Sequence, residues 1–301
     1  MEITKQMVDE DFMQLKGLAK IGKDIHSPYF CSYDNIYPFT NDRLKDIFKT
    51  LDTSNGVLTV TASGDQALMA ILNGAPYVKM FDINHLAKYF AIFKFTSISC
   101  LSYDEFIKLY KINVPFSNSI AGGFLTNPDV KLYNKVCSNT DYVCARFFEL
   151  LYEFMETATV GEKFNLVNIK YYPKLAGYLT RNDYEELKWK IKNISALDFV
   201  DCSIFDLKQN LGNEIYSAMV FSNISSYFNK LELENYLKLL KSLEENLTND
   251  GLIQAGYGTI KYKPDSIGKN SMDPKFIDDN RNCFFETKSH GMMTTFYKRS
   301  K

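Results

Sequence analysis

One short stretch decides the fold, namely Gly56-Val-Leu-Thr-Val-Thr-Ala-Ser-Gly-Asp65. Its first half is rich in β-branched residues and apolar on both faces, which is typical of a parallel strand buried in a sheet. Ser63-Gly64-Asp65 breaks the strand, and apolar residues then return at helical spacing over Gln66–Asn73. A second strand is predicted at Tyr77–Asp82 and a helix at Ile83–Ser97. This β-α-β-α order predicts two parallel neighbouring strands, because such crossovers are right-handed.

The segments on either side of this start are mainly helical. Residues 1 to 30 predict a helix followed by a loop, and a helix over Asp42–Leu51 is expected to take Thr40 or Asn41 as its N-cap. Residues 101 to about 190 predict a helical insertion, with patterns at Tyr103–Lys111, Val130–Val136, Tyr142–Thr157 and Asn182–Lys192.

Strand signals return in the last third of the chain. They lie at Ala196–Asp201, at residues 215–222 and at residues 251–256, with a helix over Leu231–Leu247 between the last two. Two further runs, Phe284–Lys288 and Met293–Lys298, predict an antiparallel pair. The fold class is therefore α/β, with a Rossmann-like, mostly parallel sheet, an antiparallel C-terminal pair and a helical insertion.

Composition excludes several classes of protein. The 301 residues carry 35 Lys+Arg and 36 Asp+Glu, a formal charge of −1, which speaks against a strongly basic nucleic-acid binder and against an acidic disordered chain. Six cysteines form no CxxC pair and only three histidines are present, so no metal site is predicted. No signal peptide and no apolar run of about 18 residues is recognised, which predicts a cytoplasmic protein without a transmembrane segment. The oligomeric state stays open.

The ligand is expected beyond the carboxyl ends of the strands, where Rossmann-like sheets bind. Asp82 ends the second strand, 18 residues after Gly64, and a carboxylate there can accept the hydroxyl protons of a ribose. The alternative is that Asp82 caps the following helix. Since Gly64 is the single glycine of the turn and no GxxxxGK[ST] motif exists, a ligand with a ribose and no phosphates fits best. S-adenosylmethionine is such a ligand.

These residues resemble the start of a class I S-adenosylmethionine-dependent transferase, and within that superfamily the S-adenosylmethionine:diacylglycerol 3-amino-3-carboxypropyltransferase branch. The matching segments are Val57–Leu68, Asp82-Ile-Asn84, Lys94, Leu101-Ser-Tyr-Asp-Glu-Phe106 and Ser222-Asn223-Ile224. The chain departs from the branch before the first strand, where Tyr33-Asp34-Asn35-Ile-Tyr37 stands in place of Trp-Glu-Asp. The group transferred, methyl or 3-amino-3-carboxypropyl, is therefore left open.

The resemblance assigns residues to the cofactor. It implies that Ser63, Gly64 and Asp65 line the methionine and ribose side, that Asp82 holds the ribose hydroxyls, and that Ile83 also belongs to the cofactor-binding set. It places Ile204 and Phe205 against the adenine. Ser203 stands where many class I enzymes have an acid that accepts from the adenine amino group; Asp206 takes over that contact or caps the next helix. The further cofactor-binding residue is Ser222.

The order of elements along the chain predicts three regions: an N-terminal helical cap at residues 1–50, an S-adenosylmethionine-binding domain at 51–100 and 190–301, and a helical insertion at 101–189.

The predicted catalytic residues are Asn223, a polar positioner, and Tyr227. The alternative for Asn223 is a hydrogen bond to the neighbouring loop backbone. Further candidates are Tyr33, Asp34, Tyr257 and His290. A general base is needed only if the acceptor must lose a proton.

The acceptor is expected to be a small molecule or lipid-like, because the insertion is rich in aromatic residues: Phe116, Phe124, Tyr142, Phe147, Phe148, Tyr152, Phe154, Tyr171 and Tyr172. The alternative is that these rings form the core of the helical layer. Basic residues that either contact an anionic membrane surface peripherally or form a solvated helix face are Lys170, Lys174, Arg181, Lys188, Lys190 and Lys192. Two other functions remain: a non-catalytic nucleoside-binding module, and an NAD(P)-dependent oxidoreductase, against which the missing glycines speak.

Overall fold

The computed structural model describes residues 4–21, 38–112, 119–120, 128–167, 170–171, 173–259, 274–289 and 292–299. The chain divides into two compact units. Unit 1 comprises Met1–Asn41, Thr61–Leu68 and Asp82–Asn193, and unit 2 comprises Asp42–Val60, Met69–Phe81 and Ile194–Lys301.

Unit 2 is built on a seven-stranded sheet with the order β5-β2-β1-β6-β7-β9-β8. The strands are β1 (Val57–Val60), β2 (Tyr77–Asp82), β5 (Ala196–Asp201), β6 (Tyr216–Val220), β7 (Leu247–Thr259), β8 (Phe284–Ser289) and β9 (Met292–Lys298). Strand β1 pairs in parallel with both β2 and β6, and β6 pairs in parallel with β7. Strand β9 is antiparallel to both of its neighbours, β7 and β8.

Counted within this sheet alone, the strand order is 3-2-1-4-5-7-6 with the last strand antiparallel, which is the arrangement of class I methyltransferases. The predicted fold class is confirmed, including the antiparallel C-terminal pair. The strand order reverses between β1 and β6, which makes their junction the topological switch point of the sheet.

The central strands form because their side chains are buried on both faces. All four residues of β1 are buried, as are all five of β6. At the start of β1, Gly56 has φ +97°, and a Cβ there would lie 2.3 Å from Cζ of Tyr77, so only glycine fits. Between the sheet and its neighbouring loop, the rings of Phe81 and Phe221 meet edge to face with centroids 5.6 Å apart.

The helices of unit 2 include α2 (Leu44–Phe48), α11 (Leu207–Leu211), α12 (Lys230–Ser242) and α13 (Pro274–Asp279). The prediction that Thr40 or Asn41 is the N-cap of α2 was wrong. Arg43 occupies that position and makes no side-chain cap bond. The backbone N–H of Thr40 instead donates to Asp65. Helix α12 begins with a capping box between Asn229 and Glu232.

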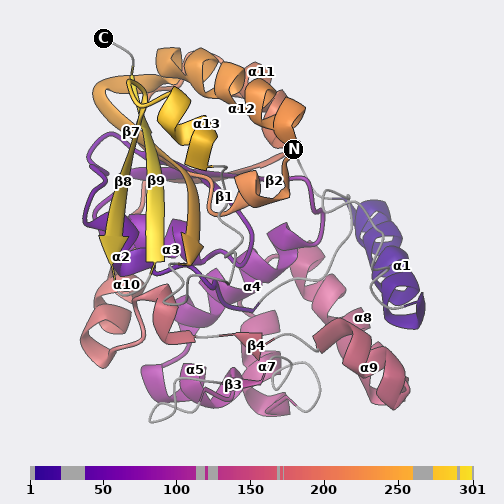
Figure 1. Ribbon diagram of the computed structural model, residues 1–301. Helices are drawn as coiled ribbons and strands as arrows, with labels where there is room; N and C mark the ends of the chain where they lie inside the picture. Colours follow the sequence, from indigo (N-terminus) through magenta and orange to yellow (C-terminus); the bar gives the residue numbers. More distant parts are fainter. Residues whose placement is uncertain are drawn as a thin grey trace. The chain divides into compact units, whose positions relative to one another are not determined.

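Unit 1 is mainly helical. Its helices are α1 (Lys5–Ile21), α4 (Ala87–Cys100), α5 (Tyr103–Leu109), α7 (Val130–Cys137), α8 (Tyr142–Thr157), α9 (Val160–Val167) and α10 (Arg181–Asn193). Helix α3 (Asp65–Leu72) starts in this unit and runs into unit 2. A short antiparallel pair, β3 (Ser119–Ile120) and β4 (Lys170–Tyr171), interrupts the helices. Helix α1 packs beside α8 and α9 (Figure 1).

Aromatic rings of α4 and α8 form the core of unit 1. Tyr89 stacks on Phe147 with ring centroids 4.2 Å apart, and the ring centroids of Phe93 and Phe148 are 4.1 Å apart. Full burial of each such ring contributes about 1.5–3 kcal/mol. By contrast, Tyr142 is 71% exposed. The aromatic content of the insertion is thus mainly core material where the structure describes it.

Candidate cofactor-binding site

The turn that follows β1, Thr61–Asp65, has an unusual backbone. Ala62 and Gly64 both have positive φ, 42° and 80°, and the Gly64 N–H donates to the Thr61 carbonyl at 2.6 Å. A Cβ on Gly64 would lie 3.3 Å from the Cα of Ala91 on α4. Glycine is therefore required here by the tight turn and by its close packing on α4.

Asp82, at the end of β2, accepts a hydrogen bond from this turn. Its Oδ2 accepts the Ala62 N–H at 2.8 Å and its Oδ1 accepts the Asn84 N–H at 2.9 Å. The N-cap of α4 is Leu86, without a side-chain cap bond, so the capping alternative for Asp82 was wrong. The carboxylate stabilises Ala62 in its left-handed conformation, which costs a non-glycine residue about 1–3 kcal/mol. Asp82 is 9% exposed and Ile83 is half-buried.

Asp65 is the centre of a buried hydrogen-bond network. Its Oδ2 accepts from the Thr40 N–H at 2.6 Å and from the Ser63 hydroxyl at 2.9 Å. Its Oδ1 accepts from Lys94 Nζ at 2.7 Å and from the Tyr178 hydroxyl at 2.6 Å. The side chain is 0% exposed. Its observed contacts therefore organise the turn, and a direct contact with a ligand stays a prediction.

Lys94 supplies the charge that balances Asp65. It is 2% exposed, donates also to the Ser63 carbonyl at 2.6 Å and lies 4.5 Å from the ring centroid of Phe39. Burial lowers the pKa of Lys94, while the charge and hydrogen bond of Asp65 oppose that shift. Burial also raises the pKa of Tyr178 well above its usual range, with Asp65 adding to the shift, so Tyr178 is a neutral donor. Lys94 was predicted only as part of a motif, and Tyr178 was not among the predicted site residues, because its partner Asp65 is 113 residues away in the sequence.

A second set of predicted residues follows β6 in unit 2. Ser222 has φ 55°, and its backbone is clamped by the Gln254 side chain. The Ser222 N–H donates to Gln254 Oε1 at 2.7 Å, and Gln254 Nε2 donates to the Ser222 carbonyl at 2.9 Å. Gln254 is 0% exposed. Sequence reasoning missed it, although a glutamine inside the apolar run of residues 251–256 was the available signal.

Asn223 lies next to this clamp at the start of the 3₁₀ turn η3 (Ile224–Tyr227), where it makes no side-chain cap bond. Its Oδ1 accepts from the Ser222 hydroxyl at 3.5 Å. The alternative role for Asn223 was a hydrogen bond to the neighbouring loop backbone. Among the described residues, its side chain makes no such bond. The side chain of Tyr227 lies outside the described part of the structure.

The residues predicted to face adenine follow β5, also in unit 2. Ser203 accepts the Phe205 N–H at 3.3 Å and so starts the turn η2 (Ile204–Asp206). Ile204 is 4% exposed and packs inward, whereas Phe205 is 40% exposed with its ring 5.3 Å from that of Phe228. Asp206 stands at the N-cap of α11 but makes no side-chain cap bond.

Comparison with known proteins gives a distant structural similarity. No protein-family model matches the chain, and no curated protein is significantly similar to it. Two structures of the rRNA methyltransferase AviRa from Streptomyces viridochromogenes match it at a TM-score of 0.41, with 10% and 12% sequence identity, over 87% of this chain and 86% of theirs. The similarity is too distant to carry any residue role to this chain.

Several other predicted residues lie outside the described part of the structure. These are Tyr33, Asp34 and His290, and the side chain of Tyr257. Within the described ranges, no group of three or more His, Cys, Asp or Glu is placed to hold a metal ion, and no helix is long and apolar enough to span a membrane. Three cations of the predicted basic surface are already paired: Arg181 with Asp104, Lys190 with Glu186, and Lys188 with the Leu101 carbonyl.

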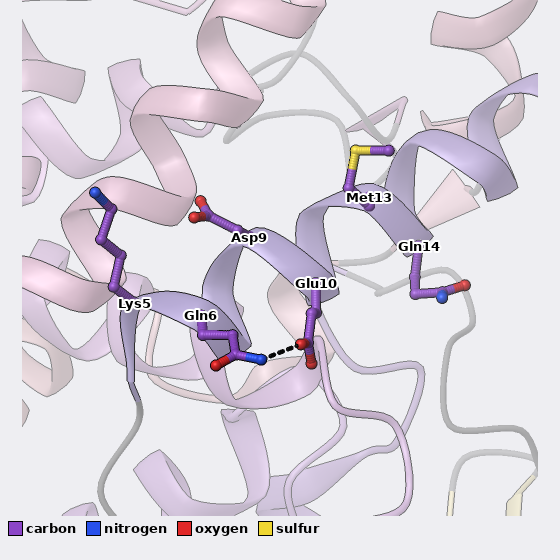
Figure 2. Close-up of a pocket in the computed structure, with 6 residues that line it drawn as sticks. All are labelled: Lys5, Gln6, Asp9, Glu10, Met13 and Gln14. Carbon is purple, nitrogen blue, oxygen red and sulfur yellow. Dashed lines mark hydrogen bonds between the residues drawn. The ribbon is translucent and has the colours of Figure 1, made fainter.

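A surface hollow of about 500 Å³ runs along one face of α1 (Figure 2). It is lined by Lys5, Gln6, Asp9, Glu10, Met13 and Gln14. Gln6 donates to Glu10 across one helical turn at 2.8 Å. The six described residues that line it include none of the predicted site residues, and the hollow follows the polar face of an amphipathic helix.

Proposed function

We propose that this protein is an S-adenosylmethionine-dependent transferase that moves a methyl or a 3-amino-3-carboxypropyl group. One observation carries the proposal: the Asp82 carboxylate ends β2 and binds the turn after β1, in a sheet of order 3-2-1-4-5-7-6. An acid in that place of a Rossmann-like sheet holds the hydroxyls of a ribose. The turn itself has one glycine, engaged in packing on α4, and so lacks the glycine-rich cradle of a dinucleotide site.

The remaining cofactor residues are proposed with distinct roles. Ser63, Gly64 and Asp65 shape the turn on the methionine side, and Asp65 does so from the interior. Phe205 is suited to pack on a base, because its ring is 40% exposed. Ser203, Ile204, Ile83 and Ser222 complete the predicted set.

The chain's part in the reaction is mainly positioning. S-adenosylmethionine supplies a carbon that its sulfonium already activates, so the protein has to align the acceptor and exclude water. Asn223 is the proposed polar positioner, since its side-chain amide is not used by the loop backbone in the described residues. Its backbone is set by Ser222, which the Gln254 side chain holds on both its N–H and its carbonyl. The acceptor is proposed to be a small molecule or lipid-like.

Calorimetric titration with S-adenosylmethionine and S-adenosylhomocysteine tests the proposal. We expect Asp82→Asn to weaken both ligands at least about tenfold, as loss of a charged hydrogen bond to a ribose does. Asp52→Asn is the matched control, because Asp52 also accepts the N–H two residues on, from Ser54 at 3.0 Å, but lies before β1. Wild-type protein that gives no heat with either ligand at millimolar concentration would refute the proposal.

Product analysis identifies the group transferred. Methyl transfer releases S-adenosylhomocysteine and aminocarboxypropyl transfer releases 5′-methylthioadenosine, so chromatography after incubation with labelled S-adenosylmethionine and cell extract separates the two. Binding without either product would make the protein a non-catalytic nucleoside-binding module. A saturable fluorescence change with NADH, in place of binding to S-adenosylmethionine, would point to an oxidoreductase.

A further inference from the structure

Four segments of unit 1 meet on the Asp65 carboxylate. Thr40 comes from the segment before α2, Ser63 from the turn itself, Lys94 from α4, and Tyr178 from the segment between the turn η1 (Pro173–Ala176) and α10. The four donors lie 2.6–2.9 Å from the carboxylate oxygens. One buried anion thus joins the N-terminal segment, the turn and the helical insertion.

Tyr178 is the member of this network that belongs to the insertion. Its side chain is 0% exposed, and its hydroxyl donates to Asp65 Oδ1 at 2.6 Å. The same oxygen accepts from Lys94, so the two donors share one side of the carboxylate. Hydrogen bonds to a buried charged group are strong, because the charge is poorly screened and has no water to replace a lost partner.

The network fixes the conformation of the turn. Ser63 is held twice, since its hydroxyl donates to Asp65 and its carbonyl accepts from Lys94. The neighbouring Ala62 and Gly64 have the left-handed backbone described above. A strained backbone of this kind persists only where several contacts over-determine it. Weakening the carboxylate network therefore allows the turn to relax.

We propose that Tyr178 is a positioning residue that couples the helical insertion to the cofactor turn. Its bond to Asp65 holds Thr61–Asp65 in the conformation that binds S-adenosylmethionine, and ligand binding in return orders the insertion around Tyr178. The coupling is reciprocal, because two sites linked by a free energy must each affect the other by the same factor. The inference rests on the proposed function.

Tyr178→Phe removes only the hydroxyl and keeps the packing of the ring. Tyr184→Phe is the matched control, because Tyr184 is also 0% exposed and its hydroxyl donates to a different group, the Leu101 carbonyl, at 3.3 Å. In calorimetric titration we expect Tyr178→Phe to weaken S-adenosylhomocysteine about tenfold, and Tyr184→Phe to leave its affinity within about twofold of wild type.

Hydrogen exchange distinguishes a coupling role from a structural one, because a tyrosine that only stabilises the fold would not change the protection that the ligand gives. In wild type and in Tyr184→Phe, S-adenosylhomocysteine should slow backbone exchange over residues 176–180. In Tyr178→Phe that protection should be lost, even at ligand concentrations that saturate the variant. Wild-type affinity in Tyr178→Phe, or ligand protection of residues 176–180 that survives the substitution, would overturn the coupling.

The ligand-free protein separates this inference from the proposed function. Without ligand, Tyr178→Phe should speed exchange of the Ala62 and Gly64 amides at least about threefold, because opening of the turn is then favoured. Tyr184→Phe should leave both amides unchanged. If wild type binds neither ligand but these amides respond, the proposed function fails while the hold of Tyr178 on the turn stands. If wild type binds the ligand and Tyr178→Phe does not change exchange of the Ala62 and Gly64 amides, the proposed effect of Tyr178 on the turn is refuted.

Discussion

Replacing Asp65 with Asn tests the network that holds the turn after β1. The substitution keeps the size of the side chain and leaves the Lys94 ammonium buried without its counterion. Asparagine also presents a single acceptor oxygen where the carboxylate presents two oxygens to four donors. Breaking a buried ion pair from one side costs about 3–5 kcal/mol. We therefore expect the free energy of unfolding to fall by about 4 kcal/mol at neutral pH.

This loss should depend on pH through Lys94. Burial lowers the pKa of Lys94 and Asp65 counteracts the shift, so removing the carboxylate lowers that pKa further. Between the lowered pKa and the ordinary lysine value of 10.5, the unfolded chain binds more protons than the folded one. Stability rises with pH in such a window. The difference in the free energy of unfolding between wild type and Asp65→Asn should therefore become smaller from pH 6 to pH 9.

Urea denaturation followed by far-ultraviolet circular dichroism at pH 6, 7.5 and 9 measures both effects. Asp104→Asn is the control, because its ion pair with Arg181 is exposed on both sides and should be worth less than about 1 kcal/mol. The double variant Asp65→Asn with Lys94→Met should be more stable than the two separate losses predict, because no unpaired charge remains. A loss below about 1 kcal/mol for Asp65→Asn, or a deficit that grows with pH, would refute the reasoning.

Two further predictions concern other parts of the fold. Gln254→Leu leaves the N–H and carbonyl of Ser222 without their partners, so we expect unfolding free energy to fall by about 3 kcal/mol, and an unchanged urea midpoint would contradict the clamp. The pKa of Glu105 is lowered to about 2. The largest cause is the hydrogen bond from the Ser102 N–H, and the next is the hydrogen bond from Lys135. Its folded-state pKa is depressed, so its contribution to stability is lost as pH falls through about 2. A side-chain NMR titration should give that midpoint, and Lys135→Met should raise it.

Local patterns predicted the elements well where one physical signal dominated. The buried run of β1 and the apolar run of β2 were found at nearly their observed bounds, as was α8, whose apolar spacing is strongly helical. The start of α4 was placed too early, at Ile83, because Asp82 and Asn84 bind the backbone there and delay the helix to Ala87. Side-chain bonds to the local backbone compete with helix formation in this way.

The roles of individual site residues were harder to predict. The family resemblance placed Asp65 beside the cofactor but did not predict its protein partners, which lie 2, 25, 29 and 113 residues away in the sequence. Gln254 escaped notice because its partner, Ser222, is 32 residues distant and belongs to a different strand end. No pattern along the chain reports such partners, since they depend on which segments fold together.

The sequence by itself determined that two parallel strands begin the sheet, that the C-terminal pair is antiparallel, and that Asp82 ends β2. These features depend on periodicity, β-branched residues and turn residues within a few positions of one another. Only the tertiary structure decided that β6 lies beside β1, that Asp82 binds the Ala62 N–H, and that Lys94 and Tyr178 share Asp65. The physical reason is that a buried charge must find its partners wherever the fold brings them, because water is excluded and an unpaired charge is costly.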